Sequence, residues 1–298
     1  MKPFDPYALV VAINHLTDVV NTASETNLFK DYFMPIFVVM LSAVTAYFIA
    51  IRGYQYQESY KNEKAKADTL NQIILKMQGM QAHLIGIKKN YYQDLTPHPI
   101  QRAMIIPPIP AQLEYETLNL NELTQLIYAK NRNVENYPWF NIASFVATVG
   151  NYNQCLEILR LRNELEVEFR PRLDPLITEH TTNGIEVTAI QEALGPMLTM
   201  KYIDLTEKLI MRVDDLLITI DDFLCNFSSM AYESLNKKYL KNYVCLHGSQ
   251  TDSDSFKEIF KRSKPVDIVD MAMVMQLAYE DAVEMYQEQS VVITTPKN

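Results

Sequence analysis

The strongest constraint on this chain is a run of twenty residues, Tyr32 to Ile51, that carries no charged side chain. As an α-helix the run would rise about 30 Å, which is the thickness of the hydrocarbon core of a bilayer. Charged residues end it on both sides, with Lys30 and Asp31 before it and Arg52 after it. A buried core helix is the alternative, but such helices are usually shorter or amphipathic. The run therefore predicts a transmembrane helix over residues 31–52, with the lipid bilayer as a partner.

The run lacks the pattern of a cleaved signal peptide. It starts thirty residues into the chain and leads into charged sequence instead of a small-residue cleavage site. We therefore expect a single-pass protein that stays anchored.

Lys and Arg are unevenly distributed on the two sides of the run. Lys2 and Lys30 stand before it, and Arg52, Lys61, Lys64, Lys66 and Lys76 stand after it. The positive-inside rule then predicts the N-terminus outside and the C-terminal domain in the cytoplasm. The three cysteines are far apart and form no CxxC, which fits free thiols in a reducing compartment. We expect a plasma-membrane protein, or an inner-membrane protein in a bacterium.

Glycine is scarce, with 7 residues in 298, against roughly 7% in average proteins. Sheets and phosphate-binding loops use glycine in their turns, so its scarcity together with many helix-forming residues predicts an all-α fold. Within residues 1–30, apolar side chains recur with helical spacing from Leu9 to Val20, and Asp5 and Pro6 precede them. This pattern predicts an amphipathic helix, which could lie in the membrane interface or pack on another subunit.

The segment after the membrane, residues 53–95, contains no proline and has apolar residues at intervals of seven. One row is Leu70, Met77, Leu84 and Tyr91, and the other is Ile73, Met80 and Ile87. The transmembrane helix is therefore expected to continue as a long helical stalk that ends near Asp94. Such rows indicate a coiled coil or a long helix in a bundle. We favour the bundle, because Gln81 and Lys88 interrupt the apolar seam.

Residues 96–117 form a proline-rich connector, with five prolines between residues 97 and 110. We expect no helix there and an extended, stiff spacer, although a ligand for a proline-recognising domain is the alternative. The connector is the best domain boundary in the sequence. Residues 118–290 follow as a helical-bundle soluble domain, and residues 291–298 form a loose tail.

Several helix limits can be predicted inside this soluble domain. An apolar helix around Trp139 and Phe145 is expected to end at Gly150, and the next is expected to break at Pro171 and Pro175. The clearest apolar stripe has spacings of three and four and comprises Ile210, Val213, Leu217, Ile220, Leu224, Phe227 and Ala231. Pro265 is expected to open a last helix that extends through Ala282.

Two pairs of acids, Asp214 with Asp215 and Asp221 with Asp222, lie seven residues apart. Acid-rich helices can hold Mg²⁺ for diphosphate chemistry, which makes these four residues the one weak alternative for a metal site. No second acidic motif accompanies them, and acids beside an apolar stripe are expected to form a solvated edge. We therefore assign no metal ligands.

Other motifs are weaker. Cys245 and His247 lack a second pair of zinc ligands, and the sequence contains no nucleotide-binding or nucleophile motif. The basic stretch from Lys237 to Lys241 could contact RNA or anionic lipid, but we favour the simpler interpretation that its lysines complement the dipole of a helix end. A net charge of −9 argues against nucleic acid as the main partner. We predict no catalytic residues, no cofactor-binding residues and no cofactor.

Two functions remain open. The first is a membrane-anchored interaction protein, a scaffold, sensor or effector that contacts other subunits or further copies of itself, with a bacterial defence or stress module as one form. The alternative is a membrane-tethered enzyme with an acidic or metal-dependent site in the helical domain. A deep polar pocket joining two or more acids, histidines or cysteines would favour the enzyme, and exposed apolar patches would favour the interaction protein.

Overall fold

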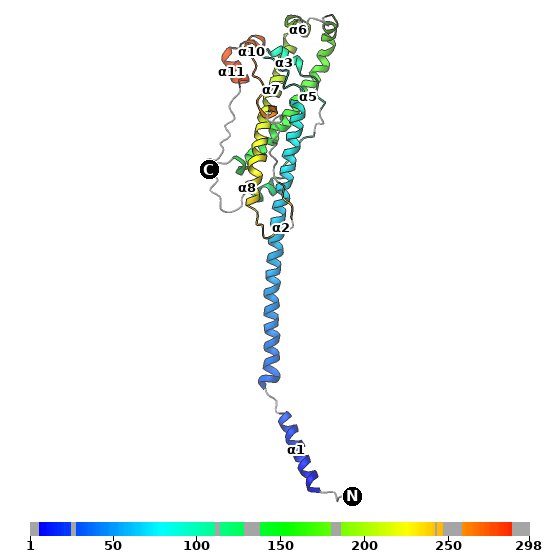
Figure 1. Cartoon of the computed structure of the whole chain (residues 1–298), viewed down its shortest axis with the longest axis vertical. Coiled ribbons are helices and arrows are strands. Elements are labelled where there is room, and N and C mark those ends of the chain that lie inside the picture. Colours follow the sequence, from blue (N-terminus) through cyan, green and yellow to red (C-terminus); the bar gives the residue numbers. More distant parts are fainter. Residues whose placement is uncertain are drawn as a thin grey trace. The chain divides into compact units, whose positions relative to one another are not determined.

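The computed structural model describes residues 6–24, 28–110, 114–127, 138–179, 186–241, 243–246 and 258–287. These residues contain helices and no β-strand, which confirms the all-α prediction (Figure 1). The chain divides into two units, residues 1–61 and residues 62–298. The expected loose tail, residues 291–298, lies outside the described residues.

The first unit contains α1 (Pro6–Ser24), a short π-helix (Phe29–Phe33) and the first part of α2 (Met34–Lys88). α1 begins at the proline that the sequence indicated. Every residue from Leu28 to Ala50 is exposed. Among the described residues, one helix, Phe29–Lys88, is long and apolar enough to cross a membrane.

Polar side chains inside this apolar segment bond to their own helix. The hydroxyl of Ser42 donates to the carbonyl of Val38 and that of Thr45 donates to the carbonyl of Leu41, each at 2.7 Å. These two hydroxyls therefore have their acceptors within the helix itself.

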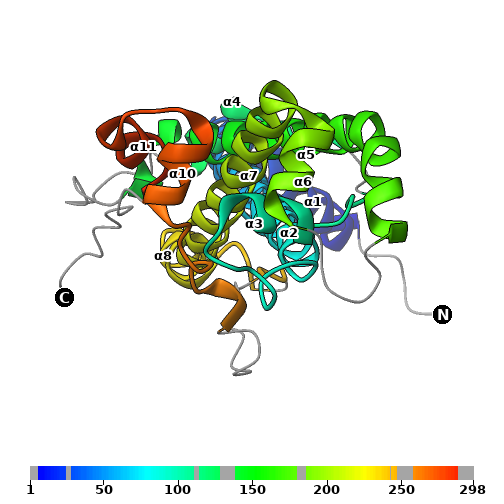
Figure 2. The ribbon, with the colours of Figure 1, turned by 90° about the horizontal axis from the view of Figure 1, so that it is seen from above.

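In the second unit, the later part of α2 contributes to one hydrophobic core with α5 (Ile142–Glu179) and α7 (Pro196–Asp222) (Figures 1 and 2). Both seven-residue rows of α2 are buried in this core. α2 runs without a break through Arg52 and ends at Lys88, short of the expected end near Asp94.

α7 continues through a π-helix (Phe223–Phe227) into α8 (Ser228–Glu233). All seven members of the stripe from Ile210 to Ala231 are buried, so the predicted face of this helix is confirmed. A second hydrophobic cluster surrounds α3 (Pro99–Ile105), α6 (Val187–Leu194), the start of α7, and the pair α10 (Ile268–Met275) and α11 (Tyr279–Tyr286). Two short elements, α4 (Leu120–Ile127) and a 3₁₀ turn (Pro138–Phe140), precede α5.

The expectation of no helix in the proline-rich segment is wrong. α3 begins at Pro99, where a missing N–H costs little, and it occupies the proline-free residues up to Ile105. Its residues Ile100 and Arg102 are fully buried. The segment is therefore partly helical and is part of the core.

The predicted ends at Gly150, Pro171 and Pro175 are also wrong, because α5 is one helix from Ile142 to Glu179. Gly150 does not adopt the positive φ that a helix-ending glycine needs. The two prolines are four residues apart on an exposed face, where water can hydrate the carbonyls that lose their N–H partners.

The expected last helix is in fact two helices. Asp267 caps α10 by accepting from the backbone N–H groups of Val269 and Asp270, so the helix starts after Pro265. Gln276 adopts a left-handed conformation, with φ of 55°, and ends α10 before α11 begins.

Candidate functional site

A row of polar side chains lies on the buried face of α7. Thr206, Glu207 and Asp214 are almost fully buried, and so is Tyr202 one turn earlier. Glu207 and Asp214 are seven residues apart, so they lie on the same face of the helix, which the other helices cover. Each carboxylate meets a buried cation from a different element.

Asp214 pairs with Lys88 at the end of α2. The Lys88 ammonium donates to Asp214 Oδ1 at 2.6 Å, and both side chains are within 2% of full burial. The backbone N–H of Ser263 donates to the other carboxylate oxygen at 2.7 Å. The prediction that Asp214 lies on a solvated edge is therefore wrong, and the interruption of the apolar seam by Lys88 is explained by this partner.

Glu207 pairs with Arg102 of α3 in a two-pronged contact. Arg102 Nε donates to Oε1 at 2.8 Å and Nη2 donates to Oε2 at 3.1 Å. Arg102 Nη1 also donates to the carbonyls of Lys264 and Thr96, at 2.7 and 3.1 Å. Burial raises the pKa of Glu207, and the hydrogen bonds from Arg102 oppose that shift. The pair ties α7 to α3 and to the segment that precedes α10.

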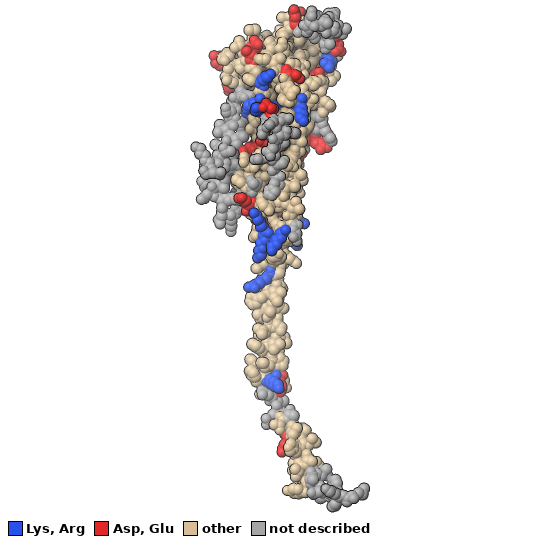
Figure 3. All heavy atoms as spheres, viewed as in Figure 1, with Lys and Arg blue, Asp and Glu red and all other residues tan. Residues whose placement is uncertain are grey.

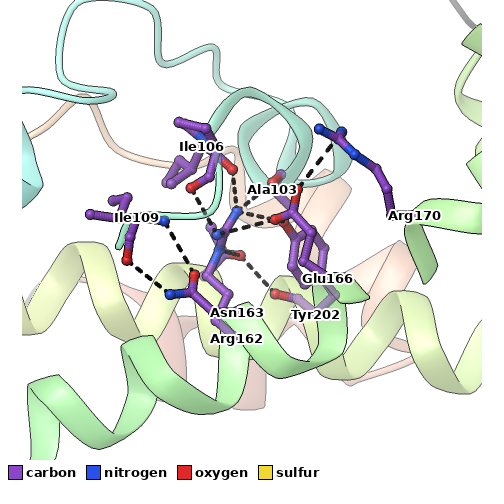
Figure 4. A network of polar contacts seen from close by, with 10 residues as sticks. Ala103, Ile106, Ile109, Arg162, Asn163, Glu166, Arg170 and Tyr202 are labelled. Carbon is purple, nitrogen blue, oxygen red and sulfur yellow. Dashed lines mark hydrogen bonds and ion pairs between the residues drawn. The ribbon is translucent and has the colours of Figure 1, made fainter. Parts of the chain in front are cut away.

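Arg162 of α5 is the most enclosed cation, with 0% of its surface exposed. It donates to Thr206 Oγ1 at 3.1 Å, to the carbonyl of Ala103 at 3.0 Å, and to the hydroxyl of Tyr202 at 2.5 Å. Figure 4 shows Arg162 between Glu166, Tyr202 and the end of α3. Because Arg162 bonds to carbonyls at the C-terminal end of α3, it satisfies acceptors that a helix end leaves unpaired.

The other three members of the two predicted acid pairs have separate partners. Asp215 accepts from Arg262 at 2.6 Å, and Asp222 accepts from the indole N–H of Trp139 at 2.7 Å. Asp221 accepts from Gln81 Nε2 at 3.5 Å, and burial raises its pKa. Asp214, Asp215, Asp221 and Asp222 are therefore not directed at one common point. Across the described ranges, no group of three or more His, Cys, Asp or Glu side chains could hold a metal ion.

The other residues that the sequence singled out are dispersed. Cys155 is buried and Cys245 is half-buried, while His247 lies outside the described residues. Burial raises the pKa of the Cys155 thiol to about 12. Lys237, Lys238 and Lys241 are exposed in turns after α8.

The sequence reasoning missed Arg102, Arg162 and Glu207, and it treated Lys88 only as an interruption of the apolar seam. Each of these charged residues falls among apolar residues with helical spacing, as Glu207 does beside Ile210. A charge on the apolar face of a helix indicates a buried ion pair, and that signal could have identified Lys88, Arg162 and Glu207. It could not have identified Arg102, which lies in α3, where no helix was expected.

Two cavities adjoin the buried network. One, of about 290 Å³, is lined by Arg102, Glu207, Asp214 and Ser263, with Tyr286 also in its wall. The other, of about 480 Å³, is more apolar and is lined by Phe169, Leu173 and Ile190 beside Glu166 and Tyr202. Thr96 Oγ1, on the wall of this second cavity, is buried and has no hydrogen-bond partner among the described residues.

A shallow groove of about 640 Å³ lies between α5, the first turns of α7, and α11. Four methionines line it, Met197, Met200, Met275 and Met285, together with Leu165, Leu198 and Leu277, and the charged residues Glu168, Lys201, Asp204 and Lys208 also border it. Met197 is 83% exposed. Methionine adapts its shape to different partners, so a methionine-lined groove is typical of surfaces that bind apolar segments of other proteins.

No protein-family model, curated protein or solved structure matches this chain.

Proposed function

We propose that this is a single-pass membrane protein whose helical bundle acts through contacts with other proteins, as a scaffold, sensor or effector. The observation that carries the proposal is the division of α2 into two parts. Its side chains are exposed and mostly apolar from Met34 to Ala50, and its later apolar rows are buried in the core of the second unit. An exposed apolar surface of this length is costly in water, and lipid tails would cover it.

The buried ion pairs support the proposal that the charged residues of α7 hold the helices together and do not take part in catalysis. Lys88, Arg102 and Arg162 come from α2, α3 and α5, and each bonds to a side chain of α7. Buried pairs of this kind cost desolvation energy and can specify one arrangement of helices among several. We propose that they set the position of α3, α5 and α7 against the helix that leads to the anchor.

The methionine-lined groove supports the interaction role over a purely structural one. Exposed apolar surface gathered in one groove is costly unless a partner covers it. In this proposal the partner is another protein, or a second copy of this chain, that presents an apolar segment.

Site-specific photo-crosslinking of the full chain in its membrane tests this role. A photoreactive residue at Met197 is expected to capture one defined partner, and the same residue at Val167, which is exposed on α5 outside the groove, is the matched control. Replacing Met285 by Glu in the Met197 probe should remove the crosslink. Equal capture at Met197 and Val167, or capture that survives Met285→Glu, would contradict the assignment of the groove.

The enzyme alternative has one observation in its favour, which is the polar cavity that joins Glu207 and Asp214. Both acids are held by cations, so a metal-dependent site there would have to displace Lys88 or Arg102. Thermal melts of the full chain in detergent with added Mg²⁺ or Mn²⁺ separate the two functions. The interaction protein predicts no metal-dependent rise in melting temperature. A rise that disappears in Asp214→Asn, or in the double variant Asp221→Asn with Asp222→Asn, would favour the enzyme.

A further inference from the structure

One end of the second unit presents lysines with little opposing charge. The end consists of the start of its part of α2, residues 62–71, and the segment 232–246 that follows the π-helix. Lys64, Lys237, Lys238 and Lys241 are exposed there, whereas Glu233 is the one exposed acid among the described residues of these two segments, and Glu63 and Asp68 are half-buried. Figure 3 shows Lys and Arg side chains gathered around the middle of α2, where the second unit begins. This local excess of positive charge contrasts with the net charge of −9 for the chain.

Contacts with α2 hold the lysine-bearing segment in place. The backbone N–H of Asn236 donates to Glu63 at 2.9 Å, and the amide of Asn71 bonds to the carbonyl of Val244 at 2.9 Å and to the N–H of Leu246 at 2.7 Å. The hydroxyl of Tyr243 donates to Asp68. These contacts engage the nearby acids Glu63 and Asp68.

The lysines keep their charge available to a partner. Glu63 is also engaged by Lys66 at 2.7 Å. Lys64 and Lys237 instead lie over the rings of Tyr243 and Tyr232, at 5.9 and 4.8 Å from the ring centres. Among the described residues, none of Lys64, Lys237, Lys238 and Lys241 pairs with an acid.

We propose that this lysine surface binds the anionic lipid headgroups of the membrane that α2 spans. The inference rests on the proposed membrane anchor. Lys64 follows Ile51 on the same helix, after a rise of about 20 Å. That rise is comparable with the sum of three lengths, namely a headgroup layer of about 5–8 Å, a lysine side chain, and one Debye length of about 8 Å at physiological salt. Lys64 is therefore within electrostatic reach of the headgroups.

The composition of the surface fits a lipid partner better than RNA. Tyrosines stand among the lysines, and Val244 is 76% exposed beside them. Amphipathic rings and an apolar side chain between cations are suited to the boundary between headgroups and acyl chains. Basic segments next to a transmembrane helix are attracted to anionic leaflets, and this attraction weakens as salt rises.

Hydrogen exchange of the full chain in lipid nanodiscs tests the proposal. We compare discs of phosphatidylcholine alone with discs that contain phosphatidylserine, and follow the peptides that cover residues 232–246. Slower exchange in the anionic discs, lost at high salt, is the expected result. Equal exchange in the two kinds of disc overturns the proposal.

Charge variants identify the residues responsible. The double variant Lys237→Glu with Lys238→Glu should lose the protection, and Lys237→Arg with Lys238→Arg should keep it. Lys89→Glu with Lys201→Glu is the matched control, because both lysines are exposed elsewhere in the second unit, and it should also keep the protection. Lys237 and Lys238 are exposed, so we expect the charge reversals to leave the melting curve unchanged. An unchanged melting curve shows that the fold is intact.

Two further outcomes bear on the lipid proposal and on the membrane anchor separately. Protection by single-stranded RNA in neutral discs, without protection by phosphatidylserine, would assign the surface to nucleic acid and overturn the lipid proposal. If the chain fails to enter discs of either composition, the membrane anchor itself is wrong. Entry into both discs with equal exchange leaves the anchor standing and removes only the lipid surface.

Discussion

Three asparagines bond to the backbone of extended segments in the way that a neighbouring strand would. Asn163 donates to the carbonyl of Ile109 at 2.9 Å and accepts from its N–H at 3.3 Å. Asn153 makes the same pair of bonds to Glu116, both at 2.9 Å, and Asn71 holds the segment at Val244. An amide side chain has one donor end and one acceptor end, which matches the two backbone groups of a residue. The chain after α3 is thereby fixed along α5 at two points.

We expect Asn163→Leu to destabilise the protein by about 1–3 kcal/mol, because two part-buried backbone groups lose their partners. Glu164→Gln, at the next and more exposed position, is the control and should change stability by less than about 0.5 kcal/mol. Urea unfolding of the full chain in detergent measures both. Equal tolerance of the two changes would show that the Asn163 contacts add nothing to the fold.

The pair of Lys88 and Asp214 makes a sharper prediction at the same scale. Lys88→Met leaves a buried carboxylate unpaired and should cost about 3–5 kcal/mol, whereas Lys88→Met combined with Asp214→Leu should recover much of that loss. Unfolding of the single and double variants measures the coupling. If the double variant is as unstable as the sum of the single ones, the two charges are independent.

Cysteine reactivity should follow burial. Burial raises the pKa of Cys155 to about 12, so its thiol stays protonated in the folded protein at pH 8. A raised pKa means that folding favours the neutral thiol, so stability falls as pH rises from the unfolded pKa of the thiol to its folded value. Alkylation at pH 8 followed by mass spectrometry should modify Cys245 well before Cys155, and should modify both equally after denaturation.

At the scale of elements, apolar residues at helical spacing predicted the buried faces of the helices correctly. The predictions of where helices begin and end were wrong where contacts with distant residues determine those ends. The stripe from Ile210 to Ala231 and the rows of α2 are buried as predicted, because a 3.6-residue period alone determines them. α3 could not be predicted, since its C-terminal carbonyls bond to Arg162 from another helix. The prediction that Asp214 lies on a solvated edge was wrong for the same reason, because its partner Lys88 lies far away in the sequence.

The stripe of α7 and its continuation gives a test of the core. Leu217→Ala or Leu224→Ala should each cost about 2–5 kcal/mol, as large-to-small changes in a core do. Asp222→Asn weakens the acceptor of the buried Trp139 indole, so it is expected to cost about 1–3 kcal/mol, more than the loss of an acid on a solvated edge would. Thermal melts of the three variants will rank them, and a neutral Leu217→Ala would mean that the face is misplaced.

The continuity of α5 through its prolines predicts a gain in stability. A proline in a helix interior costs about 3 kcal/mol relative to alanine, so Pro171→Ala should stabilise the protein by an amount of that order. Pro138→Ala, in the short 3₁₀ turn before α5, is the control and should give no such gain. If the chain broke at residue 171, the alanine variant would be neutral or destabilising.

At the scale of the whole molecule, one helix carries two different kinds of surface. The first part of α2 has a surface suited to lipid, and the later part has buried apolar rows and ends at Lys88, whose charge is paired with Asp214. The two parts belong to one uninterrupted helix, Met34–Lys88. The proposed sensor or effector role would use this continuity between the proposed anchor and the bundle.

Membrane insertion and orientation are the last prediction. The apolar run should hold the protein in membranes against alkaline carbonate, and Val39→Arg should cost about 2.5–3.5 kcal/mol of insertion free energy at the helix centre. Val39→Leu is the control and should remain in the membrane fraction.

The excess of Lys and Arg after the run, including Arg52 and Lys61, predicts a cytoplasmic C-terminus. A C-terminal reporter that works only in the cytoplasm should therefore be active, and one that works only outside the membrane should be inactive. A wild-type protein that dissolves without detergent would contradict the anchor, and an external C-terminus would contradict the orientation and require the lysine surface to face the opposite leaflet.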